Sequence, residues 1–120
     1  MSEAPEPGLA ERLRAHLAGL PPKAVPVTYA EVAAALGLQP PRTIHRVTVA
    51  LERLMEEDAA AGRPFLAALV IGRARAGLPA PGYFERAAAL GRGPAADETE
   101  RAAHAREMAA AIAHHLGGGR

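Results

Sequence analysis

The chain has 120 residues, a formal net charge of +1 and no cysteine. This length suits one domain with one modest hydrophobic core, and the absence of thiols excludes disulfides, a thiolate nucleophile and a cysteine-based zinc site. Because the charge is nearly neutral, a nucleic-acid surface has to arise from local segregation of charge. Apolar residues make up 49% but aromatic residues only 3%, which favours packed helices over a large sheet. We therefore expect a mainly α fold.

The N-terminal segment, residues 1–8, holds proline and glutamate and little that a core could bury, so it is predicted to be a disordered tail. It has neither a basic start nor an apolar run, and no stretch of the chain is long and apolar enough to cross a bilayer. We expect a cytoplasmic protein without a membrane partner. A first helix is predicted over residues 8–20, where four leucines recur at helical spacing.

The central segment, residues 28–55, has the outline of a helix-turn-helix. Thr28 and Glu31 have the spacing of a capping box, which predicts a helix over residues 29–36. Gly37 suits a left-handed C-cap, and the following proline pair suits the first turn of a new helix over 41–60. The residues expected on the inner face of the first of these helices are Tyr29, Val32, Ala33 and Leu36.

The helix predicted over 41–60 has the clearest amphipathic pattern in the chain. Its core stripe is expected to be Ile44, Val47, Leu51, Leu54 and Met55. Its opposite side is expected to carry Arg42, Arg46, Val49 and Arg53, with His45 beside them. The second half holds Glu52, Glu56, Glu57 and Asp58, which are expected in water on the outer face. Acid near a helix C-terminus opposes the helix dipole, so this charge order indicates a first half that approaches phosphate.

The apolar run over residues 65–71 is predicted to be a short buried strand. A basic loop, residues 72–77, follows it in the position of the wing of a winged helix, and it contains Arg73 and Arg75. A short helix over 83–90 completes the domain. The expected organisation is therefore the tail 1–8, a winged helix-turn-helix-like domain 9–92 with one short strand, and a linker with an additional C-terminal helix over 93–120.

The last helix is predicted over 97–116, with Asp97 and Glu100 as a capping pair. Its apolar stripe is thin and consists of Ala105, Met108, Ala109, Ile112 and Leu116. Such a stripe favours weak packing on the domain or pairing with a second copy. This helix is the basis of the alternative function, a helical protein-protein interaction or homodimerisation module.

No constellation of residues points to catalysis. The one serine, Ser2, lies in the predicted tail, and the sequence has no glycine-rich phosphate loop and no nucleophile elbow. The histidines of the last helix match neither an HExxH motif nor a paired i, i+4 site. We therefore expect a non-enzymatic protein with no metal, no cofactor and no small-molecule substrate.

Duplex DNA is the expected partner. A helix-turn-helix places the first residues of its second helix toward base edges and phosphates, and here those positions are Arg42, Thr43, His45 and Arg46, with Arg53 farther along. Arg73 and Arg75 of the basic loop are expected to add phosphate or minor-groove contacts. A merely solvated cationic face is the plain alternative. RNA is less favoured, because few aromatic side chains are present for base stacking.

The segment VPVTYAEVAAALG followed by PPRTIHRVTVAL resembles the DNA-binding domain of O6-alkylguanine DNA alkyltransferases and alkyltransferase-like proteins. The resemblance covers about half the chain and implies a winged helix-turn-helix. It also implies that Tyr29 helps to rotate a nucleotide out of the duplex and that Arg42 fills the gap left in the stack. In the family's Pro-Cys-His-Arg motif the arginine is matched here by Arg73, but Leu69-Val70-Ile71-Gly72 has neither the proline, the cysteine nor the histidine. Without the acceptor thiol, alkyl transfer is excluded.

Overall fold

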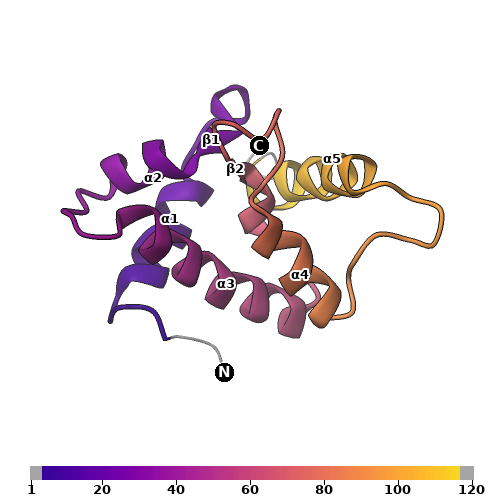
Figure 1. The fold of residues 1–120 in the computed structure, drawn as a ribbon, viewed down its shortest axis with the longest axis horizontal. Coiled ribbons are helices and arrows are strands. Elements are labelled where there is room, and N and C mark those ends of the chain that lie inside the picture. The colour runs from indigo at the N-terminus through magenta and orange to yellow at the C-terminus, as the bar shows by residue number, and fades with distance from the viewer. Residues whose placement is uncertain (1–3, 117–120) are drawn as a thin grey trace.

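Helices account for most of the computed structural model, which describes residues 4–116 (Figure 1). The α-helices are α1 (Leu9–Ala18), α2 (Tyr29–Ala35), α3 (Thr43–Ala61), α4 (Pro81–Ala89) and α5 (Glu100–Ala111). Shorter turns are the 3-10 segments η1 (Pro22–Ala24) and η2 (Leu66–Leu69) and the π turn η3 (Ile112–Leu116). The strands β1 (Val27–Thr28) and β2 (Val70–Ile71) pair in parallel, with Val27 opposite Val70. The prediction of a mainly α fold with a short strand element is confirmed.

Local capping signals place the central helices. Thr28 Oγ1 accepts a hydrogen bond from the backbone N–H of Glu31 at 3.1 Å, and the Glu31 carboxylate accepts one from the Thr28 N–H at 2.9 Å. This reciprocal pair is the predicted capping box at the start of α2. Gly37 then adopts a left-handed conformation with φ 70°, and the Leu38 N–H closes back onto the Ala33 carbonyl at 3.0 Å. The turn between α2 and α3 is therefore encoded locally.

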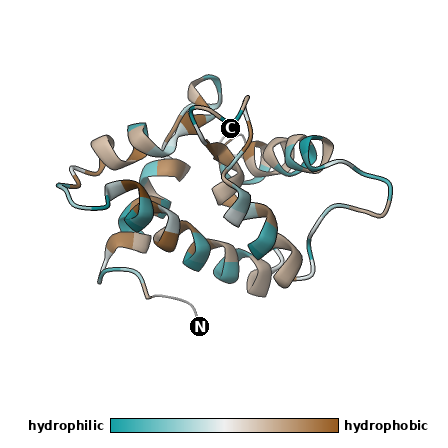
Figure 2. Cartoon of the chain, in the orientation of Figure 1, coloured by the Kyte–Doolittle hydropathy of each residue, from teal (hydrophilic) through white to brown (hydrophobic). Residues whose placement is uncertain are grey.

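The core lies where α1, α2 and α3 meet η2. Leu13, Leu17, Val32, Val47 and Leu66 are all 0% exposed. Figure 2 shows hydrophobic and hydrophilic residues alternating along α3, as expected for a helix that covers a core on one side. Among the described residues, no helix combines the length and the apolar character needed to span a bilayer.

The core stripe predicted for α3 is wrong at two positions. Ile44 is 44% exposed, and Val49 is 7% exposed although it was expected on the outer side. The first turn of α3 leaves the Ile44 side chain uncovered. Val49 borders a hollow of about 90 Å³ together with Ala4, Pro5, Glu6 and Arg46. Residues 4–6 of the predicted tail thus lie against α3, and residues 1–3 lie outside the described residues.

The apolar run 65–71 is buried along most of its length, but only Val70 and Ile71 are strand. Residues 66–69 form a 3-10 turn instead, because a continuous apolar run signals burial without fixing the backbone conformation. The tight turn brings the η2 backbone against α5. His104 Nε2 lies 2.9 Å from the Ala68 carbonyl oxygen, and the Phe65 N–H donates to the Glu107 carboxylate at 2.7 Å.

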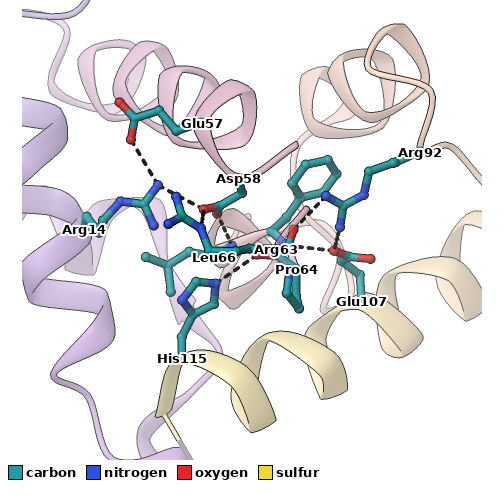
Figure 3. Close-up of polar contacts among 10 residues, drawn as sticks. Arg14, Glu57, Asp58, Arg63, Pro64, Leu66, Arg92, Glu107 and His115 are labelled. Atoms are coloured by element: carbon teal, nitrogen blue, oxygen red, sulfur yellow. Dashed lines mark hydrogen bonds and ion pairs between the residues drawn. The ribbon is translucent and has the colours of Figure 1, made fainter. Parts of the chain in front are cut away.

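Helix α5 is held on the chain's own core by polar and apolar contacts (Figure 3). Arg92 donates to Glu107 and stacks 3.9 Å above the Phe65 ring, and His115 Nε2 lies 2.9 Å from the Pro64 carbonyl oxygen. The larger members of the predicted apolar stripe, Met108, Ile112 and Leu116, pack against the core, whereas Ala105 and Ala109 are exposed. The predicted start is wrong: Thr99, not Asp97, caps the helix by accepting from the Ala102 N–H at 3.0 Å.

Candidate nucleic-acid interface

The first turn of α3 is open to solvent. Its N-cap residue, Arg42, has φ 58° and ψ 38°, a left-handed conformation that costs a non-glycine residue about 1–2 kcal/mol. Within residues 4–116 no side chain caps the helix, and its first turn contains no acidic residue. The backbone N–H groups at this end therefore lack a side-chain acceptor, and the positive end of the helix dipole faces outward.

Three of the predicted contact residues come together at this end. Arg42, His45 and Arg46 line one open surface hollow of about 570 Å³ with Gln39 and the proline pair before α3. Arg42 and His45 are exposed, and Thr43 is half-buried beside them. We call this region the α3 hollow.

Arg46 is already engaged within the chain. Its Nε and Nη2 atoms both donate to the Glu6 carboxylate, with Nη2 3.1 Å from Oε1. Its Nη1 atom donates to the carbonyls of Gln39 at 2.6 Å and Pro41 at 3.1 Å. The hydrogen bonds from Arg46 lower the pKa of Glu6 below its ordinary value. Arg46 thus links the N-terminal segment to the turn that precedes α3.

The other predicted arginines lie outside the hollow. The Arg53 side chain is 46% exposed, and its Nε atom is 3.9 Å from the Glu56 carboxylate. In the basic loop 72–77, Arg73 is exposed, whereas Arg75 folds back and donates from Nε to the Pro79 carbonyl at 3.1 Å. In Figure 1 this loop follows β2 at the top of the view, whereas α3 begins at the left. The basic loop and the α3 hollow are therefore two separate cationic regions.

Tyr29 lies in the core, as its helical position predicts, and not on the cationic surface. It is 7% exposed, and its hydroxyl accepts a hydrogen bond from the Ala80 N–H at 2.8 Å. Burial raises the pKa of Tyr29 above its ordinary value. The hollow beside it, shared with Met55 and Tyr83, measures about 10 Å³, which is room for about one water molecule. Tyr29 thus ties the start of α2 to the segment before α4.

The acidic half of α3 is paired with arginines of other elements, which corrects the expectation that these carboxylates stand in water. Arg86 of α4 binds Glu52 at 3.2 Å and Glu56 at 2.9 Å. Arg14 of α1 binds Glu57 at 3.1 Å and Asp58 at 3.0 Å, and Asp58 is 0% exposed (Figure 3). The sequence gives no sign of these pairs because the partners lie 30 or more residues away.

No protein-family profile, no curated protein and no solved structure matches the chain. The pairing of its cations is the most informative feature of its surface. Most of the arginines in residues 4–116 donate to a carboxylate or to a backbone carbonyl. The exposed cations of this described part without an intramolecular hydrogen bond or ion pair are Lys23, Arg42 and Arg73.

Proposed function

We propose that this chain is a non-enzymatic protein that binds duplex DNA, with the first half of α3 as the principal contact and the basic loop 72–77 as a second one. The carrying observation is the exposed, uncapped start of α3, where Arg42 projects without an internal partner beside His45 and Thr43. A helix N-terminus with an adjacent arginine favours phosphate for two reasons, the outward N–H groups and the positive dipole end.

The same turn offers groups that suit base edges. Ile44 is the one large hydrophobic side chain among the described residues that is strongly exposed, and an apolar side chain in the major groove can contact a thymine methyl group. Arg42 can either fork onto a guanine or grip phosphate. Tyr29 is left out of the proposed surface because its hydroxyl is occupied in the core. The proposal is therefore duplex binding without nucleotide rotation by Tyr29.

The number of available cations sets the expected salt dependence. If Arg42 and Arg73, the two arginines of the proposed surface that are unpaired within residues 4–116, neutralise two phosphates, log Kobs should fall with log[salt] at a slope of about −1.8. Affinity should then drop roughly twelve-fold between about 50 and about 200 mM salt. This is a weak dependence compared with proteins that make many phosphate contacts, and it follows from the arginines that the fold already uses internally.

Fluorescence anisotropy with a labelled duplex tests the proposal. Arg42→Gln should weaken binding several-fold and make the slope shallower by about 0.9, the share of one phosphate contact. Arg106→Gln is the matched control, since it removes the same charge from α5, where Arg106 is exposed and bound to Glu98 at 2.9 Å. Equal affinities for Arg42→Gln and the parent would remove the α3 hollow from the interface. No binding by the parent at about 50 mM salt would remove the function.

Single-stranded DNA and double-stranded RNA serve as competitors in the same assay. Duplex DNA should compete best, because the major groove of A-form RNA is too narrow and deep for side chains to read. The alternative function, docking through α5, gains no support from its apolar stripe, whose larger side chains face the core. Sedimentation velocity of the full chain would reveal a dimer if α5 has a second role.

A further inference from the structure

Glu6 and Arg46 form an ion pair across 40 residues of sequence, and it lies at the edge of the α3 hollow. The Glu6 side chain is 43% exposed and that of Arg46 28%. The Glu6 carbonyl also accepts from the Leu9 N–H at 3.1 Å, which joins this short segment to the start of α1. The carboxylate is therefore held beside the proposed DNA surface without being buried.

The geometry of Arg46 is that of a prepared anion site. Its Nη1 atom is fixed by the carbonyls of Gln39 and Pro41, so the plane of the guanidinium is set by the turn before α3. The remaining Nε and Nη2 edge carries the parallel N–H pair that binds either a carboxylate or a phosphate in bidentate fashion. Glu6 occupies this edge. A phosphate oxygen pair could take the same place with Arg46 unmoved.

We propose that Glu6 is an autoinhibitory phosphate mimic, which masks Arg46 and is displaced when duplex DNA binds the α3 hollow. This inference rests on the proposed function. Displacement requires only that these two partly exposed side chains separate, so residues 4–6 can stay against Val49 while the Glu6 carboxylate leaves. Arg46 then joins Arg42 on the phosphates, and the masked state limits binding to polyanions that can outcompete one carboxylate.

The test compares Glu6→Gln, Arg46→Gln and the double variant with the parent, using anisotropy with a labelled duplex over a series of salt concentrations. Glu6→Gln should bind about two- to fivefold tighter at low salt, the range expected for releasing one exposed ion pair. Its salt slope should match that of the parent, because Arg46 neutralises the same phosphate in both complexes, whereas Arg46→Gln should make the slope shallower by about 0.9. In the Arg46→Gln background, the same change at Glu6 should give no gain.

Glu85→Gln is the matched charge control. Glu85 is exposed on α4, which packs on α3 away from the hollow, and the substitution changes the net charge as Glu6→Gln does. If Glu85→Gln tightens binding as much as Glu6→Gln, or if the gain persists without Arg46, a general charge effect is at work and the masking role is overturned.

The remaining outcomes separate the inference from the proposed function. If the parent binds duplex DNA and Glu6→Gln binds equally well, the function stands and the masking role falls. If neither the parent nor Glu6→Gln binds, both fall. A readout without DNA is the NMR resonance of the Arg46 Nε–H group, which should move on Glu6→Gln. An unmoved resonance would show that the ion pair is absent in solution and would overturn the inference.

Discussion

Replacing Asp58 with alanine removes the most deeply paired carboxylate of the described chain. Asp58 is 0% exposed, accepts hydrogen bonds from Arg63 and from the Leu66 N–H, and forms an ion pair with Arg14 (Figure 3). Arg14 Nη2 and Arg63 Nε each lie 3.0 Å from Oδ1, and the Leu66 N–H lies 3.0 Å from Oδ2. These contacts join α1, the end of α3 and the start of η2, so the substitution acts on three elements together.

The loss in free energy of unfolding depends on whether each partner of Asp58 can find another acceptor after the substitution. The buried Leu66 N–H loses its acceptor, which costs about 1–3 kcal/mol. The Arg14 and Arg63 side chains are 26% and 37% exposed, so water can take over, and each lost pair costs about 0–1 kcal/mol. The free energy of unfolding should therefore fall by about 3 kcal/mol. Glu57→Ala removes one exposed pair with Arg14 and should cost about 0.5 kcal/mol.

Urea unfolding followed by circular dichroism at 222 nm measures the difference. With a denaturant slope of about 1.5 kcal/mol/M, Asp58→Ala should lower the midpoint by about 2 M and Glu57→Ala by about 0.3 M. Asp58→Asn should fall between them, because its amide oxygen can still accept from the Leu66 N–H while the charge is gone. Midpoints for Asp58→Ala and Glu57→Ala within about 0.3 M of each other would refute the reasoning.

Three further predictions concern other parts of the chain. Arg42→Gly should leave the free energy of unfolding in urea unchanged or raise it by up to about 1 kcal/mol, because glycine accepts the left-handed backbone at φ 58°. It should nevertheless weaken duplex binding as Arg42→Gln does. A clear loss of stability would contradict backbone strain at this cap. His104 is buried among Tyr83, Arg101 and the Ala68 carbonyl, and burial lowers its pKa below 6.5. As the pH falls, the unfolded chain therefore binds the proton before the folded chain does. The contribution of His104 to stability should be complete above about pH 6.5 and should fall as the pH drops toward the lower folded pKa. The difference in free energy of unfolding between the parent and His104→Gln, measured from pH 7 to 5, isolates this contribution, and parallel profiles would contradict it. Truncation after Gly93 should uncover Phe65 and η2 and lower the urea midpoint sharply, as measured by circular dichroism at 222 nm. A truncated chain as stable as the parent would mean that α5 is not part of the core.

The features predictable from the sequence are those that a few neighbouring residues determine. The capping box of Thr28 and Glu31 and the left-handed turn at Gly37 are encoded within one or two turns, and both are present. The cap of α5 shows the limit of such signals. Asp97 and Thr99 are both good N-cap residues, and Glu98, which accepts from the Ala95 N–H and from Arg106, places the turn so that Thr99 is used.

The features that could not be predicted depend on segments far away in the sequence. Hydrophobic periodicity predicts which face of a helix a side chain lies on, but the segments that pack against that face decide whether it is buried. Val49 is covered partly by residues 4–6. Ile44 lies in the first turn of α3, where no other part of residues 4–116 buries it. Asp58 was expected in water because its place on the helix was assigned to the outer face. Its burial is possible because it is paired, and its partners come from α1 and from the segment after α3.

The charge order along α3 also has a structural cause that limits what it indicates about DNA. The carboxylates of its second half pair with Arg14 and Arg86 from neighbouring helices. Their positions are therefore explained by contacts within the fold, without any nucleic acid. These pairs tie helices together, and the one at Asp58 is buried. The pair between Arg46 and Glu6 differs, because it joins α3 to a short N-terminal segment and not to another helix. Exposed pairs contribute little to stability, so this is the end of α3 where an external polyanion could replace an internal carboxylate without opening the core.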